Sequence, residues 1–307
     1  MRINTKISLI LLIGLYLYSA SPVSAADDKS WTATAGIKGA FSAGGTEAYN
    51  NLQPFASFQY DLDAVSLKIS YLHYLNYQVS PLVDSQIIAS TTEYDYLHIN
   101  RFDFGINQRY YKKLEAGVEV GYFFGESQYR RIASLFTLGW YFDKVYAGGE
   151  FSFNRTSFSF YSDSLAENMD ITYDTFDVYG ELVYTYTDRT SLDAGLSLLW
   201  ISSDALNETF SKKSLRFGFS HLIVDMLNFS GGLNMGYDSN QYFHAGPDAG
   251  LALNLPDYVS LNLFYSFTWY RYSSTNVSGL GGKFQVSTTS VSTYNTHFLS
   301  YGATLRY

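Results

Sequence analysis

Cysteine is absent from the 307 residues, and proline occurs only 5 times. A chain without cysteine has no disulfides and no thiolate metal ligands, so its stability must come from packing or from its solvent. No Pro/Gly/Ser-rich linker divides the sequence, and no apolar run beyond residue 25 is long enough for a membrane-spanning helix. These absences favour one domain that is held together without covalent cross-links.

Positive charge is also in deficit, because 20 Lys and Arg residues stand against 28 Asp and Glu. The formal net charge of −8 lacks the basic excess of a nucleic-acid-binding protein, so we expect no nucleic-acid partner. Tyrosine (29 residues) and phenylalanine (23) are abundant instead, and few windows have helical periodicity. Aromatic residues favour strands, so the composition indicates an all-β chain.

The start of the chain has the three parts of a secretory signal peptide. Arg2 and Lys6 form a short basic region, an apolar run follows over residues 7–18, and small residues precede the predicted cleavage site. The run is shorter than the roughly 20 residues of a spanning helix, although an uncleaved anchor is the alternative. We therefore expect a signal peptide over residues 1–25 and a mature domain over 26–307, whose net charge without Arg2 and Lys6 is −10.

Apolar and polar residues alternate along most of residues 26–307. In "KLEAGVEVGYFFG", Leu114 and Val118 share one face, and Glu115 and Glu119 share the other. A period of two indicates β-strands. We predict about fourteen strands of roughly ten residues or more, against five or six residues in soluble proteins.

Tight and long connections alternate along the chain. An up-and-down meander whose two ends face different compartments has this pattern, and transmembrane β-barrels combine short periplasmic turns with longer outer loops. The sequence therefore predicts an all-β fold, a transmembrane antiparallel up-and-down β-barrel of about fourteen strands. Tight turns are predicted near Asp63, Asp143, Asp188 and Pro256, and long polar loops near residues 78–92, 155–170 and 272–292.

A soluble sandwich or propeller is the alternative fold, and the two faces of the strands argue against it. Eight strands enclose an interior that side chains fill, whereas about fourteen leave a wide lumen that an inward apolar face does not close. The faces assigned to lipid are almost free of charge, as hydrocarbon demands, because Lys or Arg at mid-bilayer costs about 2–4 kcal/mol. The opposite faces carry Gly, Ser, Thr, Asn and charged residues, which suit water.

The chain ends in "YGATLRY", where Tyr301, Ala303, Leu305 and Tyr307 alternate with small or polar residues. With the signal peptide and the long strands, this ending resembles that of Gram-negative outer-membrane β-barrel proteins. The resemblance implies contact with outer-membrane lipid, and it implies that these four residues are the signal read by the barrel-assembly machinery, with tyrosine last in place of the usual phenylalanine. Length and strand number resemble the monomeric fourteen-stranded porins. Fatty-acid transporters of the same strand number are less similar, because we expect the first strand near Trp31 without a preceding plug.

Alternate residues of a strand face the same side, so the odd or even position of a residue along its strand (its parity) predicts whether it faces lipid or the lumen. A set of charged side chains is assigned to the lumen in this way. Acidic residues concentrate on the fifth to ninth predicted strands, and basic residues occur on the fourteenth, first, third and fourth strands, on both sides of the seam. One hypothesis is a constriction in which an acidic wall faces a basic wall and gives a mild cation preference, because walls of charge set ion selectivity. The alternative is that these residues pair between neighbouring strands and stiffen the barrel. The residues near mid-height are Lys38, Arg101, Glu119, Glu150, Glu181, Arg216 and Asp248.

Aromatic side chains near the predicted strand ends form a second set. On the outer face of a barrel they are typical of the girdles at the two membrane–water interfaces, whereas in a soluble fold they would belong to the core. The last strand, "FLSYGATLRY", is expected to close the barrel by pairing with "WTATAGIKGAF" near the start. The girdle residues are Trp140, Trp200, Trp269, Tyr258, Phe142 and Tyr307.

Catalytic motifs are weak throughout the chain. Ser220 and His221 are adjacent, so on a strand their side chains point to opposite faces and do not act together. His244 and Asp248 share the inward face, but their spacing along a strand is about 13 Å, too far for a hydrogen bond. The five histidines lack metal-ligand spacing, and no cofactor motif occurs. We expect no enzymatic activity, no metal and no cofactor, with an outer-membrane enzyme as an alternative.

The sequence thus predicts a porin for the passive diffusion of ions and small polar solutes. An alternative of a different class is a non-conducting surface barrel whose outer loops bind a ligand or a partner protein. Conductance in a lipid bilayer separates these two functions.

Overall fold

The computed structural model describes most of the chain between residues 29 and 306. The predicted signal peptide over 1–25, the expected loop over 78–92 and the terminal Tyr307 lie outside the described residues. The described ranges are 29–43, 49–62, 65–77, 97–110, 113–162, 167–203, 209–239, 242–255, 258–280 and 284–306.

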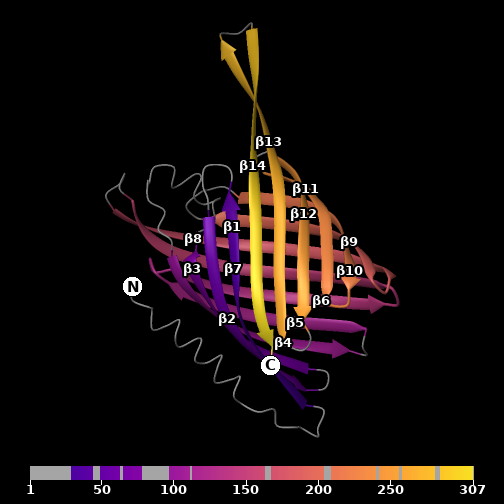
Figure 1. Ribbon diagram of the computed structural model, residues 1–307. Coiled ribbons are helices and arrows are strands. Elements are labelled where there is room, and N and C mark those ends of the chain that lie inside the picture. Colours follow the sequence, from indigo (N-terminus) through magenta and orange to yellow (C-terminus); the bar gives the residue numbers. More distant parts are fainter. Residues whose placement is uncertain are drawn as a thin grey trace, which may run out of the picture.

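Fourteen antiparallel strands form one closed barrel (Figure 1). Each strand pairs with its neighbours in the sequence, which confirms the predicted all-β, up-and-down barrel. Within the ranges above, no helix has the length and apolar character to cross a membrane. The strands are β1 (Lys29–Ala43), β2 (Tyr49–Leu62), β3 (Val65–Tyr77), β4 (Leu97–Tyr110), β5 (Leu114–Gly125), β6 (Arg130–Phe142), β7 (Val145–Ser162), β8 (Glu167–Thr187), β9 (Thr190–Ser203), β10 (Thr209–Val224), β11 (Leu227–Asp238), β12 (Tyr242–Leu255), β13 (Val259–Leu280) and β14 (Phe284–Arg306).

The seam between β14 and β1 has a continuous antiparallel register. Thr34 lies opposite Arg306, and Gly39 lies opposite Tyr301. The predicted pairing of the last strand with the first is therefore confirmed. Closure leaves no unpaired strand edge, which a bilayer interior requires because hydrocarbon offers no hydrogen-bond partner to the backbone.

Two segments predicted as long loops are strands instead. The β7–β8 hairpin continues through much of 155–170 until Ser162 pairs with Glu167, and the β13–β14 hairpin includes residues 272–280 and 284–292. The loop prediction is wrong there because ladder hydrogen bonds do not require an apolar face, and segments such as "FQVSTTSVSTY" are rich in strand-forming Val, Thr and Tyr. The β13–β14 hairpin projects well beyond the rest of the barrel (Figure 1).

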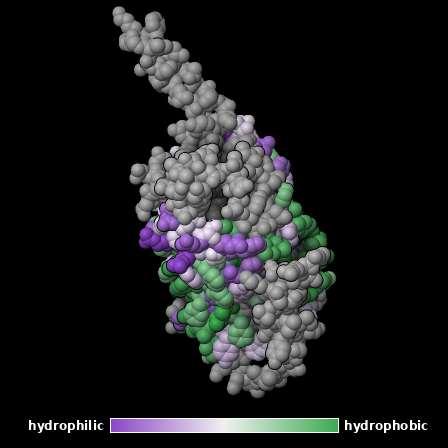
Figure 2. Space-filling view, turned by 90° about the vertical axis from the view of Figure 1, so that its left-hand side faces the viewer, coloured by the Kyte–Doolittle hydropathy of each residue, from purple (hydrophilic) through white to green (hydrophobic). Residues whose placement is uncertain are grey.

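The outer and inner faces of the barrel differ as the alternation predicts. Large apolar side chains are exposed on the outside, and examples are Ile69 (56 %), Leu138 (57 %) and Leu182 (57 %). Figure 2 shows hydrophobic residues over much of the described surface on one side, next to a band of hydrophilic residues. Soluble monomers rarely expose apolar patches of this extent, so the outer surface fits lipid.

The predicted girdle residues within the described ranges lie at the two ends of the outer surface. Trp140 and Phe142 are exposed beside the β6–β7 turn, and their rings stack at 5.5 Å between centroids. Tyr258 is exposed at the start of β13, at the same end of the barrel. Trp200 and Trp269 are half-buried near the end with the long connections. This placement fits two aromatic belts at the membrane–water interfaces.

Candidate functional site

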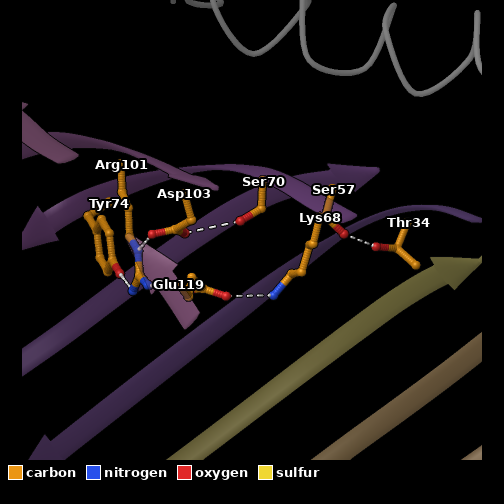
Figure 3. A network of polar contacts seen from close by, with 8 residues as sticks. All are labelled: Thr34, Ser57, Lys68, Ser70, Tyr74, Arg101, Asp103 and Glu119. Atoms are coloured by element: carbon orange, nitrogen blue, oxygen red, sulfur yellow. Dashed lines mark hydrogen bonds and ion pairs between the residues drawn. The ribbon is translucent and has the colours of Figure 1, made fainter. Parts of the chain in front are cut away.

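Arg101 is the centre of an ion cluster on the inner wall of β3 to β5 (Figure 3). Its Nε atom lies 2.6 Å from Oδ1 of Asp103, and its Nη2 atom lies 3.2 Å from Oε1 of Glu119. Glu119 also contacts Lys68 at 3.2 Å, while Ser70 donates a hydrogen bond to Asp103 at 3.0 Å. Two cations and two carboxylates therefore neutralise one another at this place, which we call the Arg101 cluster.

Aromatic rings hold the Arg101 guanidinium in place. The guanidinium lies 4.8 Å from the ring centroid of Phe123, and Arg131 lies at the same distance from that ring. The hydroxyl group of Tyr74 lies 3.5 Å from Arg101 Nη1. Cation–π contacts are favourable at such distances, so Phe123 links the charged residues to the apolar side chains nearer the loops.

A second ion cluster lies on β9, β10 and β12 around Arg216. Its Nε and Nη2 atoms donate to the two carboxylate oxygens of Asp248, at 3.1 and 2.9 Å, and Nη1 contacts Asp193. The side chain crosses β11 at Gly232, where a Cβ would lie 2.9 Å from Arg216 Nη2. A Cβ at Gly218 would likewise lie 2.7 Å from Nη1, so these two glycines leave the space that the guanidinium occupies.

Three carboxylates on β7 and β8 have no such cation. Glu150, Asp177 and Glu181 form no ion pair within the described part of the chain. Glu181 accepts a hydrogen bond from the Tyr179 hydroxyl at 3.0 Å, and Asp177 accepts one from Ser197 at 3.4 Å. We call these three residues the acidic wall.

Lys38 is the cation on the other side of the lumen. It lies on β1, and β1 and β8 are on opposite sides of the closed ring of strands. Its ammonium group lies 4.9 Å from the ring centroid of Phe55 and forms no ion pair with any described residue. The seven residues predicted for the lumen thus divide into two arrangements. Paired clusters contain Arg101, Glu119, Arg216 and Asp248, whereas Lys38, Glu150 and Glu181 have no ionic partner in the part of the chain that the structure describes.

A polar cavity of about 510 Å³ lies on the tight-turn side of the Arg101 cluster. Gln59, Asn107 and Thr137 are among its lining residues, together with the ion pair between Arg109 and Glu115 at 3.5 Å. Cavities of this size accommodate small-molecule ligands. Its lining suits water, ions and polar solutes.

An apolar cluster occupies the inner side of β3 to β9 near the loops, and the sequence reasoning missed it. Ile99 and Phe123 are 0 % and 2 % exposed, and they share the inward parity of Arg101 and Glu119. The available signal was the loss of alternation in "GYFFG", where an aromatic residue takes an inward position. The lumen is therefore polar over only part of its height. The cluster consists of Tyr74, Leu97, Ile99, Phe123, Tyr129, Phe158, Tyr173 and Ile201, with Leu72, Ala133 and Leu199 packed against it.

The residues considered for catalysis do not come together. Ser220 donates a hydrogen bond to Asn228 at 2.9 Å, whereas the exposed His221 contacts Thr190 at 2.9 Å. His244 contacts Ser214 at 3.2 Å, whereas Asp248 binds Arg216. Among the residues that the structure describes, no group of three or more His, Asp or Glu is placed to hold a metal ion.

No protein-family model and no curated protein sequence matches the chain. Solved structures do match it. The CymD monoaromatic hydrocarbon channel aligns with a TM-score of 0.57 at 8% identity, over 90% of this chain and 88% of CymD. A deltaS2 mutant of the TodX monoaromatic hydrocarbon channel gives 0.52 at 10% identity, over 92% and 90% of the two chains. A loop L8 deletion mutant of OmpT, an outer membrane protein of Vibrio cholerae, gives 0.51 at 10% identity, over 92% and 100%. At these identities the likeness concerns the fold alone, and the chain has the fold of outer-membrane β-barrel proteins.

Proposed function

We propose that the protein is an outer-membrane channel for the passive diffusion of ions and small polar solutes, with a mild preference for cations. The observation that carries this proposal is the acidic wall of Glu150, Asp177 and Glu181, which has no compensating cation among the described ion pairs. Other inner-wall acids, such as Glu119 and Asp248, are each neutralised by a neighbouring Arg or Lys. The uncompensated charge attracts cations into the lumen, because acidic walls favour cations in pores.

The same proposal places residues 26–307 in the outer membrane after removal of the signal peptide. The exposed apolar outer surface then lies against lipid, and Tyr301, Ala303, Leu305 and Tyr307 serve as the signal for the assembly machinery. The proposal assigns no catalytic step to the chain. It agrees with the separation of His244 from Asp248, because each of them has a different partner.

The acidic wall makes a prediction about ion selectivity. Replacing Glu150 and Glu181 by glutamine and Asp177 by asparagine is expected to abolish the cation preference, because three negative charges leave the lumen. The measurement is the reversal potential of single channels in a planar bilayer under a salt gradient. Asp143→Asn is the matched control, because it removes a carboxylate from the exposed β6–β7 turn and should leave the selectivity unchanged.

Two results of that experiment contradict the proposal in different ways. An unchanged reversal potential in the triple variant shows that the acidic wall does not set the selectivity. A wild-type protein that inserts into the bilayer without conducting supports the alternative of a surface barrel whose outer loops bind a ligand or a partner protein.

The apolar cluster supports a second candidate function, the passage of small apolar solutes. Its buried apolar side chains lie at the loop end of β3 to β9. An apolar solute that enters this region exchanges one hydrophobic environment for another, so its transfer costs little free energy. CymD and TodX are described as monoaromatic hydrocarbon channels, and both have this barrel fold. On this alternative, solutes would cross the apolar cluster rather than the polar cavity.

Polar substitutions in the apolar cluster distinguish the two candidates. Ile99→Thr with Ile201→Thr exchanges an ethyl group for a hydroxyl group in two buried members of the cluster, so the path becomes more polar and is not narrowed. If apolar solutes cross there, toluene entry into proteoliposomes is expected to fall several-fold, while ion conductance stays the same. Ile132→Thr is the control, because Ile132 is 56 % exposed on the outer face. Equal toluene entry in all three proteins excludes the apolar path.

A further inference from the structure

The outer face of β10 to β13 carries a row of four side chains at the loop end. Lys213 lies opposite Tyr237, Tyr237 opposite Phe243, and Phe243 opposite Arg271. Lys213 has the parity of Leu215, which is 45% exposed on the lipid-facing surface. Residues directly opposite on neighbouring strands have their Cβ atoms about 5 Å apart, so these four form a continuous surface. We call them the Lys213–Arg271 row.

The middle of the row is aromatic and its two ends are cationic. Tyr237 is 59 % exposed, and its ring lies 5.1 Å from that of Phe243. Phe243 in turn meets Trp269 of the predicted girdle edge-on at 6.3 Å. Three steps between strands separate the backbones of Lys213 and Arg271 by roughly 14 Å. The row therefore lies at the edge of the aromatic belt, where charged side chains adjoin aromatic ones.

Neither cation of the row forms an ion pair with a residue that the structure describes. Lys213 and Arg271 are both exposed. Two other exposed cations on the outside are paired instead: Arg155 lies 3.7 Å from Asp174, and Arg189 in the β8–β9 turn lies 3.3 Å from Asp225. An anion gains little beside those pairs, whereas it meets two uncompensated charges at the row.

We propose that the Lys213–Arg271 row binds the phosphorylated headgroup of a membrane lipid. Lys and Arg donate charge-assisted hydrogen bonds to phosphate oxygens. The amphipathic ring of Tyr237 lies against the headgroup and the upper acyl chains, and the apolar ring of Phe243 lies against the acyl chains. The pair of cations holds phosphate groups at either end of the aromatic pair. This inference rests on the membrane location in the proposed function, but it does not depend on conduction through the lumen.

The test compares the wild type with Lys213→Gln/Arg271→Gln in nanodiscs of phosphatidylcholine that contain a minority of phosphatidic acid. Native mass spectrometry of the released protein counts the lipids that stay bound. The wild type is expected to retain phosphatidic acid in preference to phosphatidylcholine. The double variant should lose this preference by about fivefold for each cation removed, in line with the usual contribution of a Lys or Arg at an anionic membrane surface.

Lys113→Gln/Lys144→Gln is the matched control, because it removes two exposed cations from turns at the opposite end of the barrel. It should keep the wild-type preference for phosphatidic acid. The proposal is overturned if the row variant retains as much phosphatidic acid as the wild type. It is also overturned if the control variant loses the preference for phosphatidic acid as strongly as the row variant. Conductance is recorded on the same proteins. If the protein prefers phosphatidic acid but does not conduct, the channel proposal is contradicted and the lipid site is supported. If it conducts but shows no lipid preference, the lipid site is contradicted and the channel proposal is unaffected.

Discussion

Replacing Arg216 by glutamine is expected to lower the free energy of unfolding by about 3 kcal/mol. Its guanidinium forms two hydrogen bonds with Asp248, at 3.1 and 2.9 Å, and also contacts Asp193. The Asp248 side chain is only 6 % exposed, so removal of Arg216 leaves a poorly hydrated carboxylate with a second negative charge nearby. Denaturant unfolding of the protein in lipid vesicles measures the change.

Arg109→Gln provides the matched control for this prediction. Arg109 also pairs with an inner-wall carboxylate, Glu115, but its side chain is 62 % exposed and the distance is 3.5 Å. Exposed pairs of this kind contribute about 1 kcal/mol or less. If Arg216→Gln is no more destabilising than Arg109→Gln, the Arg216 cluster does not stabilise the barrel. Adding Asp193→Asn and Asp248→Asn to Arg216→Gln should restore most of the stability, because no uncompensated charge then remains.

The Arg216→Gln variant also changes the charge of the lumen. Two carboxylates lose their cation, so the reversal potential should move further toward that of a cation-selective pore. This direction is opposite to the shift expected when Glu150, Asp177 and Glu181 are neutralised. If lumen charge sets the selectivity, the reversal potential must shift in one direction in Arg216→Gln and in the other in the triple variant. Variants that only disturb packing would not give two shifts of opposite sign.

The barrel was predictable because two solvents act on every strand. Lipid outside and water inside impose a period of two, as in Leu114 and Val118 against Glu115 and Glu119. The seam was predictable for a related reason. A strand that reaches the end of the chain in alternation must pair with another edge, and β1 offers that edge opposite β14.

The partners of the lumen charges were not predictable from the sequence. Arg216 binds Asp248 across β11, and this contact depends on the register of three strands and on the absence of a side chain at Gly232. Parity gives the face of a residue but not the reach of a long side chain. Parity also treats every inward position as wet, which fails at Ile99 and Phe123, where buried neighbours exclude water.

Substituting Gly36 by alanine is expected to prevent closure of the barrel. A Cβ at Gly36 would overlap the backbone oxygen of Ala303 on β14, and it would also lie 2.9 Å from two ring atoms of Phe55. A backbone oxygen within a paired strand does not move aside without breaking the ladder between β1 and β14, so the whole seam is affected. We expect a large loss in the yield of folded barrel in lipid vesicles, measured by the electrophoretic shift between unheated and heated samples.

Gly302→Ala is the matched control for the seam. Gly302 faces the lumen on β14 opposite Lys38, and a Cβ there would lie 3.6 Å from its nearest neighbours, the Ile37 oxygen and Lys38 Cγ. This is ordinary van der Waals contact, so the variant should fold with nearly the wild-type yield. Because both variants add one methyl group to the same seam, their difference isolates the close approach at Gly36 from the general effect of replacing glycine. Equal yields, whether high or low, contradict the assignment of Gly36 as the position that lets the first and last strands meet.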